Sequence, residues 1–357
     1  MGKGFPTVNY DLSKVDNAGI LLANTADIDD SENLRGALEY INNWRASHYY
    51  PISTIQVSLR AKAKEVDSTA LIVQRLKKMQ SIKRKLRYNL SLSSSLSCVQ
   101  DIGGCRVILS TVDNVFTLRK LLEESRWKQK LVRTNDYITR PKRTGYRGIH
   151  LIYEYYSKNN PSYDGMSVEI QLRTKLQHIW ATAVESVDVF TGSELKSNKG
   201  KDEWKRFFAL VSSFFAIEEN GRTVPGTPKN SADILQELVV LNEQYDFFGT
   251  IETINNSVKH IVNNLNYSKK ENVFYLLSLK SAEHTVEVIK YDKRSKKEAN
   301  VEYLRREKNE EKEKQNVVLV SATSIEGLKQ AYPNYFMDIE DFYNKLKKVF
   351  LKARVSI

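Results

Sequence analysis

The stretch MSVEIQLRTK at residues 166–175 constrains the fold more than any other part of the chain. Successive side chains of an extended strand point to opposite faces, so this stretch divides into an apolar set and a polar set. The apolar set is Val168, Ile170 and Leu172, and the polar set is Glu169, Gln171 and Arg173. The pattern therefore predicts a sheet that buries one face and presents a carboxylate, an amide and a guanidinium on the other.

Strand and helix patterns alternate along the first two thirds of the chain. Strand patterns cover residues 68–77, 106–110, 148–157 and 166–175, and residues 127–138 read as a strand or a loop. Helical patterns cover residues 31–47, 55–64, 78–88, 112–126, 176–190, 202–217 and 234–265, the last as one long or two medium helices. This alternation predicts a mixed sheet flanked by helices, which is an α+β architecture.

The pattern changes near Ser268 into a ββαβα block. Two strand patterns, a charged helix, a further strand and an amphipathic helix follow one another, at 273–281, 285–292, 299–315, 316–324 and 338–355. We therefore expect two domains, one over residues 1–267 and a smaller one over residues 268–357.

Cysteine and histidine are scarce in this chain. Two cysteines, Cys98 and Cys105, and five histidines exclude a disulfide framework and disfavour a structural zinc site, which needs four suitable ligands. No apolar run is long enough to span a membrane, so we expect a cytoplasmic protein without a membrane partner.

Positive charge is concentrated in two stretches. The net charge is +12, and basic residues dominate both 60–87 and 125–153, which favours a polyanionic partner. Within RLKKMQSIKRKLR (75–87), a triphosphate could be held by Arg75, Lys77, Ser81, Lys85 and Arg87. The alternative is a solvated cationic helix face. No GxxxxGK[ST] pattern is present, which argues against a P-loop enzyme.

Asp101 and Glu169 are acidic residues in these basic surroundings. Two carboxylates together with substrate phosphates suit Mg²⁺, and a carboxylate can also accept a proton from an attacking hydroxyl. Each acid could instead be a structural ion-pair partner. Tyr146, with Arg147 and His150 nearby, could stack on a nucleobase or pack into the core.

Four motifs resemble, in order and spacing, the synthetase domain of the RelA/SpoT alarmone synthetases: RLKKMQSIKRKLR, QDIGGCR, DYITRPKRTGYRGIH and VEIQLRT. The resemblance covers roughly residues 30–265. It implies a nucleotidyltransferase-like fold and transfer of pyrophosphate from ATP to a ribose 3′-hydroxyl with Mg²⁺. No hydrolase motif of the HD type precedes the motifs, so we expect no built-in reverse activity.

The resemblance also implies residue roles. ATP would be bound by Arg75, Lys77, Ser81, Lys85 and Arg87, and the catalytic and metal-binding residues would be Asp101 and Glu169. The acceptor would be bound by Tyr146, Arg147, His150, Gln171 and Arg173.

Asn135 departs from the family pattern, which usually has a lysine just before the DYI tripeptide. This departure weakens the case for GTP or GDP as acceptor. Toxic small members of the family are similar to this chain and modify the 3′ CCA end of tRNA, which inhibits translation, so we expect a tRNA acceptor. The alternatives are a (p)ppGpp synthetase and a non-catalytic basic RNA-binding module.

The C-terminal block, with Tyr332-Pro-Asn-Tyr335 before its last helix, resembles the zinc-finger-like, zinc-free domain of CapRel fused toxin-antitoxin proteins. The resemblance implies that Tyr332 and Tyr335 block the ATP pocket until phage capsid protein displaces the domain, in antiphage defence. Taken alone, two tyrosines around a proline are also an ordinary turn with one ring buried.

Overall fold

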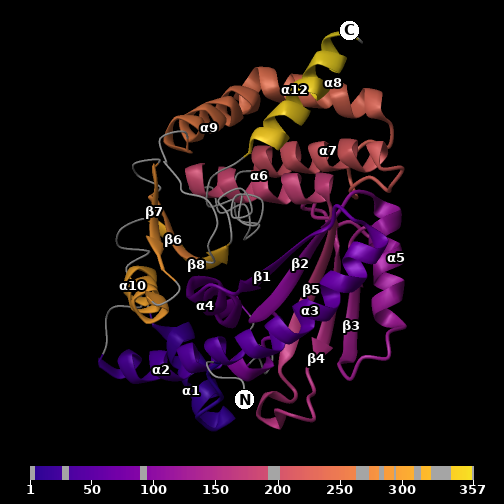
Figure 1. The fold of residues 1–357 in the computed structure, drawn as a ribbon. Coiled ribbons are helices and arrows are strands. Elements are labelled where there is room, and N and C mark those ends of the chain that lie inside the picture. Colours follow the sequence, from indigo (N-terminus) through magenta and orange to yellow (C-terminus); the bar gives the residue numbers. More distant parts are fainter. Residues whose placement is uncertain are drawn as a thin grey trace. The chain divides into compact units, whose positions relative to one another are not determined.

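The computed structural model describes most of the chain. The described residues are 5–25, 32–88, 95–191, 202–262, 273–280, 285–292, 295–308, 315–322 and 339–355. They divide into two compact units (Figure 1). The first unit is Met1–Asp136 with Gly148–Thr174, and the second is Tyr137–Arg147 with Lys175–Ile357.

A five-stranded mixed sheet forms the centre of the first unit. Its strands are β1 (Leu71–Leu76), β2 (Gly103–Leu109), β3 (Lys130–Asp136), β4 (Ile149–Glu154) and β5 (Ser167–Thr174). Their spatial order is β1-β2-β5-β4-β3, as Figure 1 shows. β2 and β5 are parallel, whereas the other neighbours are antiparallel. The predicted mixed sheet and α+β class are therefore confirmed.

The alternating pattern of β5 explains which face of the sheet is covered. The helices α3 (Tyr49–Val66) and α5 (Val112–Glu123) pack against this sheet. Ile52 of α3 lies so close to Gly103 that a Cβ added there would be 2.4 Å from its side chain. Gly103 is paired with Val168, so α3 covers the face that carries the apolar residues of β5. The polar residues of β5 face the opposite side.

Further helices complete the first unit. They are α1 (Leu12–Asn24), α2 (Glu32–Ser47) and α4 (Met79–Tyr88), with short 3₁₀ turns η1 (Leu96–Cys98) and η2 (Pro161–Tyr163). α1 packs against α2, α4 and η1. Arg87 at the end of α4 donates to the carbonyls of Ala23 (2.6 Å) and Thr25 (2.5 Å), and so caps the C-terminus of α1.

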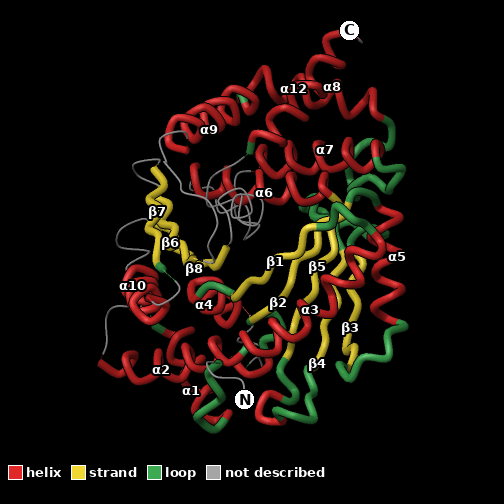
Figure 2. Tube along the Cα trace, viewed as in Figure 1, coloured by secondary structure: helices red, strands yellow, loops and turns green. Residues whose placement is uncertain are grey.

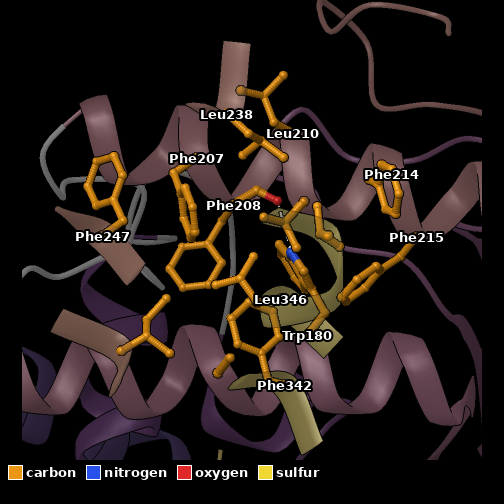
Figure 3. Packing of buried hydrophobic residues seen from close by; sticks show 14 of the residues in the cluster. Trp180, Phe207, Phe208, Leu210, Phe214, Phe215, Leu238, Phe247, Phe342 and Leu346 are labelled. Carbon is orange, nitrogen blue, oxygen red and sulfur yellow. Dashed lines mark hydrogen bonds between the residues drawn. The ribbon is translucent and has the colours of Figure 1, made fainter. Parts of the chain in front are cut away.

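Five helices build the aromatic core of the second unit. They are α6 (Lys175–Thr191), α7 (Asp202–Glu218), α8 (Ser231–Tyr245), α9 (Phe247–Val262) and α12 (Glu340–Val355). Figure 3 shows the cluster that they bury, in which Trp180 of α6 and Phe208 of α7 lie near Phe342 and Leu346 of α12. Burying a side chain of this size contributes roughly 1.5–3 kcal/mol, so the core secures α12 against α6, α8 and α9.

The break between α8 and α9 depends on one aspartate. Asp246 adopts a left-handed backbone (φ +48°), and its N–H bonds the carbonyl of Asn242 at 2.8 Å. Its side chain then accepts from the N–H of Gly249 at 3.1 Å, so Asp246 ends one helix and caps the next. Of the two predicted arrangements, two medium helices is correct.

A three-stranded antiparallel sheet also belongs to the second unit (Figure 2). Its strands β6 (Val273–Lys280), β7 (Thr285–Tyr291) and β8 (Gln315–Ala322) have the order β7-β6-β8, and α10 (Lys296–Lys308) packs against β6 and β8. The elements therefore follow the predicted ββαβα order. The expected boundary near residue 268 falls in 263–272, outside the described residues, and stays a prediction.

Two further sequence expectations can be compared with the elements. The helix expected at 55–64 begins earlier, at Tyr49. Pro51 does not prevent this start, because it lies in the first turn, where proline is tolerated. α1 was not expected at all. Among the described helices, none combines the length and apolar character needed to cross a bilayer.

Candidate active site

The loop between β1 and α4 brings three candidate residues into one ion cluster. Lys77 donates from Nζ to Asp101 Oδ2 at 2.6 Å, and Lys85 donates to Asp101 Oδ1 at 2.8 Å. The backbone also fixes this position, because the N–H of Lys77 bonds the carbonyl of Ile102 at 2.7 Å. We call Lys77, Lys85 and Asp101 the aspartate cluster.

Arg45 of α2 contacts the backbone of the aspartate cluster. It is buried, and its Nε donates to the carbonyl oxygen of Lys77 at 3.2 Å. Sequence analysis assigned Arg45 only to a helix, because a contact across 32 residues leaves no local signal. Ser81 lies in the first turn of α4, where free backbone N–H groups favour anions.

The polar face of β5 forms a second connected group. Glu169 Oε2 accepts from Gln171 Nε2 at 2.6 Å, and Gln171 Oε1 accepts from Arg173 at 3.1 Å. The other oxygen of Glu169 accepts from Nδ1 of His150 on β4 at 2.8 Å. We call Glu169, His150, Gln171 and Arg173 the glutamate row, and its members hold one another in fixed orientations.

Neighbouring strands extend the glutamate row across the sheet. Gln171 is paired with Arg106 of β2 on one side and with His150 of β4 on the other, and His150 is paired with Asn135 of β3. Arg106 donates from Nε to Gln171 Oε1 at 3.5 Å. Paired residues share a face, so Asn135 stands on the same face as the glutamate row.

Gly104 makes this arrangement possible beside Glu169. A Cβ at Gly104 would lie 2.2 Å from the carbonyl oxygen of Glu169, a distance that no side chain tolerates without a backbone shift. The second glycine of the QDIGGCR motif is therefore required because a larger residue would clash with the backbone of β5. The sequence alone indicates no role for this glycine.

The strand register relates the aspartate cluster to the glutamate row. β1 ends beside the beginning of β2, since Leu76 pairs with Gly103, and the parallel β5 begins beside Gly103 too, through Val168. Asp101 and Glu169 therefore both lie near the amino ends of β2 and β5. Neither carboxylate points into the apolar face.

Electrostatic effects link the same two groups and keep both carboxylates ionised. Burial alone would raise the pKa of Glu169, but His150, Arg75 and Gln171 outweigh it and hold that pKa well below its ordinary value. Burial likewise opposes ionisation of Asp101, and Lys77 and Lys85 nevertheless lower its pKa. Arg75 of β1 also lowers the pKa of Lys77, after the larger effect of burial, so Arg75 acts on both groups.

The candidate acceptor residues divide between the two units. His150, Gln171 and Arg173 lie on the sheet of the first unit, whereas Tyr146 and Arg147 belong to the segment 137–147 of the second. Tyr146 is half-buried and packs against the aromatic core, which was the structural alternative for this residue. Arg147 is 2% exposed and pairs with Glu219 at 2.8 Å.

The remaining candidates have different positions. Arg87, predicted to bind ATP, uses its side chain to cap α1. Tyr332 and Tyr335, predicted to be autoinhibitory, lie outside the described residues. Within the described residues, no group of three or more histidine, cysteine, aspartate or glutamate side chains is arranged to hold a metal.

Comparison with known proteins places these residues in a recognised region. Residues 74–188 match the family model described as the region found in RelA/SpoT proteins. The match begins within β1 and includes both groups of charged residues and the segment that carries Tyr146.

Two curated relatives from Bacillus subtilis (strain 168) match part of the chain. The GTP pyrophosphokinase YjbM is 31% identical over 117 residues, which are 33% of this chain and 55% of the relative. The GTP pyrophosphokinase YwaC is 30% identical over 111 residues, or 30% of this chain and 52% of the relative. The chain thus spans about half the length of these relatives.

Solved structures give weaker similarities. The small alarmone synthetase 1 of Bacillus subtilis, bound to its product pppGpp, has 21% identity and a TM-score of 0.43, over 50% of this chain and 92% of that chain. A GTP pyrophosphokinase family protein of Streptococcus pneumoniae has 25% identity and a TM-score of 0.40, over 47% and 83%. The sequence matches are the stronger finding, and they show that residues 74–188 are similar to the region found in RelA/SpoT proteins.

Proposed function

We propose that this protein is an ATP-dependent pyrophosphokinase. The observation that carries the proposal is the arrangement at the amino ends of β2 and β5. There two ionised carboxylates, Asp101 and Glu169, lie in an excess of positive charge from Arg75, Lys77 and Lys85. Pyrophosphoryl transfer depends on positioning phosphates and stabilising charge, and these groups are suited to both tasks.

The cations are assigned to ATP. Lys77 is held by its backbone and by Arg45, and it presents a charged donor at the start of α4. Lys85 reaches the same carboxylate from two turns further along the helix. Both lysines exchange Asp101 for phosphate oxygens when ATP binds, since charge-assisted contacts of this kind are among the strongest hydrogen bonds. Arg75 and Ser81 complete the set, and Arg87 contributes by fixing α4 to α1.

Asp101 and Glu169 suit Mg²⁺ in their chemistry. Mg²⁺ prefers one or two carboxylates together with phosphate oxygens, and both side chains are ionised oxygen donors. A bound Mg²⁺ would neutralise charge on the transferred phosphates. Because the pKa of Glu169 lies well below its ordinary value, its carboxylate is a weak proton acceptor. This favours metal binding over general-base catalysis as its main role.

The acceptor that we propose is the 3′ end of tRNA. Asn135 supports this assignment because it stands on the same face as the glutamate row, opposite His150, where the family usually supplies a lysine. The site therefore has one cation fewer for the phosphates of a free nucleotide. A tRNA brings many phosphates of its own, which match the net charge of +12.

A guanine nucleotide is the second candidate acceptor. The specific observation in its favour is that both curated relatives from Bacillus subtilis are GTP pyrophosphokinases. Transfer to GTP or GDP would make the protein an alarmone synthetase, with the same roles for ATP and Mg²⁺.

One experiment separates the two acceptors. Purified protein is incubated with Mg²⁺ and ATP labelled at the γ-phosphate, together with tRNA, periodate-oxidised tRNA, GDP or GTP. We expect label in intact tRNA and none in oxidised tRNA, which lacks the 3′-hydroxyl. Label in GDP or GTP instead would identify an alarmone synthetase, and label in no acceptor, with the wild type and with Tyr332→Ala alike, would contradict the pyrophosphokinase proposal.

We further propose that the C-terminal block regulates the enzyme through Tyr332 and Tyr335, with a phage capsid protein as trigger. The support is the resemblance of the block together with its observed strand and helix order. Expression of Tyr332→Ala should stop growth, whereas Tyr332→Phe, which keeps the ring, should not. Normal growth with Tyr332→Ala at wild-type protein levels would contradict autoinhibition.

A further inference from the structure

The segment 137–147, which carries Tyr146, is held by the helices of the second unit. Gly145 adopts φ +93°, and a Cβ there would lie 2.6 Å from the ring of Trp180. Its carbonyl oxygen accepts from Ser212 Oγ at 2.5 Å. Trp180 is itself fixed, because its indole N–H donates to the carbonyl of Phe208 at 2.9 Å. The turn before Tyr146 is therefore pressed against α6 and α7.

Arg147 anchors the other side of Tyr146. Its guanidinium is 2% exposed and lies 2.8 Å from Glu219 Oε2, just after the end of α7. Gln177 of α6 donates to the same oxygen at 3.4 Å, so two helices take part in the contact. Burial lowers the pKa of Arg147, and the charge of Glu219 opposes this effect.

Stability alone is a weak explanation for this ion pair. The free energy needed to remove two charges from water is about as large as the free energy gained from their attraction. Replacing buried ion pairs by apolar residues is therefore often neutral or stabilising. What a buried ion pair with defined geometry does provide is a fixed position for the backbone on either side. Here the neighbouring residue on one side is Tyr146.

We infer that Arg147 is a positioning residue, which acts through Glu219 to hold Tyr146 ready for the acceptor. Its guanidinium is committed to Glu219 and does not itself contact the acceptor. This assignment rests on the proposed function and on the sequence-based expectation that Tyr146 stacks on the acceptor base. It replaces the acceptor-binding role that the sequence resemblance implies for Arg147.

The test compares two ion pairs, one just after the C-terminal end of α7 and one between α7 and α8. Glu219→Gln keeps the shape of the side chain but removes the charge that holds Arg147. The matched control is Glu237→Gln, because Glu237 pairs with Arg206 of α7 at 2.5 and 2.7 Å, away from the segment 137–147. Each variant loses one ion pair of the second unit, but only the pair of Glu219 involves a residue next to Tyr146.

Two readouts are measured on the full chain. We expect Glu219→Gln to raise the KM for the acceptor roughly ten- to hundred-fold with an unchanged KM for ATP, since small displacements of a binding group have effects of this size. Hydrogen exchange at the amides of 137–147 should become faster in the same variant. Glu237→Gln should alter neither quantity.

The outcomes are separable. Unchanged exchange at 137–147 and an unchanged acceptor KM in folded Glu219→Gln would overturn the positioning role. If no acceptor is modified by the wild type or by Tyr332→Ala, the proposed function fails, but faster exchange in Glu219→Gln would still support the anchoring of this segment. If Glu219→Gln does not fold, Arg147→Lys serves instead, because it keeps the charge and loses the planar geometry of the guanidinium.

Discussion

The aspartate cluster and the glutamate row surround their carboxylates in different ways. Asp101 is held by two lysines, one of which, Lys85, has a side chain that is 37% exposed. Glu169 is held by side chains that project from β4 and β5, and its own side chain is 10% exposed. One carboxylate therefore has flexible, charged partners, whereas the other has partners fixed by strand register.

This difference indicates a division of labour. In the proposed function the lysines, on long side chains, leave Asp101 for phosphates, so this function requires the aspartate cluster to exchange partners. The glutamate row cannot rearrange without disturbing the pairing of β4 with β5, so it is built to stay in place. We infer that substrate binding reorganises the first group and is guided by the second.

The largest expected effect comes from removing each carboxylate charge in turn. Glu169→Gln and Asp101→Asn should each lower kcat on the order of 10²- to 10⁴-fold, because each removes a group that the proposed function assigns to the reacting phosphates. The two variants should differ in ATP affinity without Mg²⁺. Asp101→Asn should bind ATP at least as tightly as the wild type, because its lysines no longer have a competing partner, whereas Glu169→Gln should leave this affinity unchanged. Turnover and calorimetric ATP binding measure the two effects.

The control for these variants is Glu154→Gln, which alters a surface ion pair with Lys130 on the same sheet. It should leave both quantities unchanged. If Glu169→Gln retained full turnover and every biological effect, the enzymatic account would be wrong and a basic RNA-binding module would explain the chain better.

A smaller effect is expected from the two lysines. Lys77→Met should raise the KM for ATP roughly ten- to hundred-fold, the equivalent of losing a charge-assisted contact of about 1.5–3 kcal/mol. Lys85→Met should raise it less, about five-fold at most, because exposed charges are screened by solvent. Initial rates at varied ATP concentration, with Lys130→Met as control, provide the measurement. Equal increases in the KM for ATP would contradict the expectation that the more buried lysine contributes more to ATP binding.

The sequence was sufficient to predict the sheet and the polar face of β5. The period of two along β5 decides which side chains share a face, and this local property survives folding. Residues 68–88 likewise revealed a strand followed by a basic helix, because both patterns are short and complete. The mixed class and the order of the elements follow from the same signals.

The sequence could not reveal the contacts between distant segments. Arg87 was predicted to bind ATP from its place in a basic run, and the structure adds that its side chain donates to the carbonyls of Ala23 and Thr25 at the end of α1, a helix that was not expected. Arg147 was assigned from its neighbour Tyr146, and its partner Glu219 lies 72 residues further along the chain. Only the folded structure shows which charges are already paired.

The smallest expected effect is the dependence of stability on acid. The pKa of the Asp101 and Glu169 carboxyls lies below the ordinary values of 3.8 and 4.5, so the unfolded chain binds protons more readily than the folded chain. Each carboxylate therefore stabilises the fold above about pH 4.5, and this contribution is lost as the pH falls, at about 1 kcal/mol for each unit by which the pKa is lowered.

Urea unfolding between pH 6 and pH 3 measures this loss. Glu169→Gln and Asp101→Asn should each flatten the decline, since a neutral side chain takes up no proton. High salt should shrink the contribution of Asp101 more than that of Glu169, because Lys85 is partly exposed and the glutamate row is not. An equal response of both carboxylates to salt would show that the two groups are equally accessible, and the proposed division between an exchangeable and a fixed group would then have no physical basis.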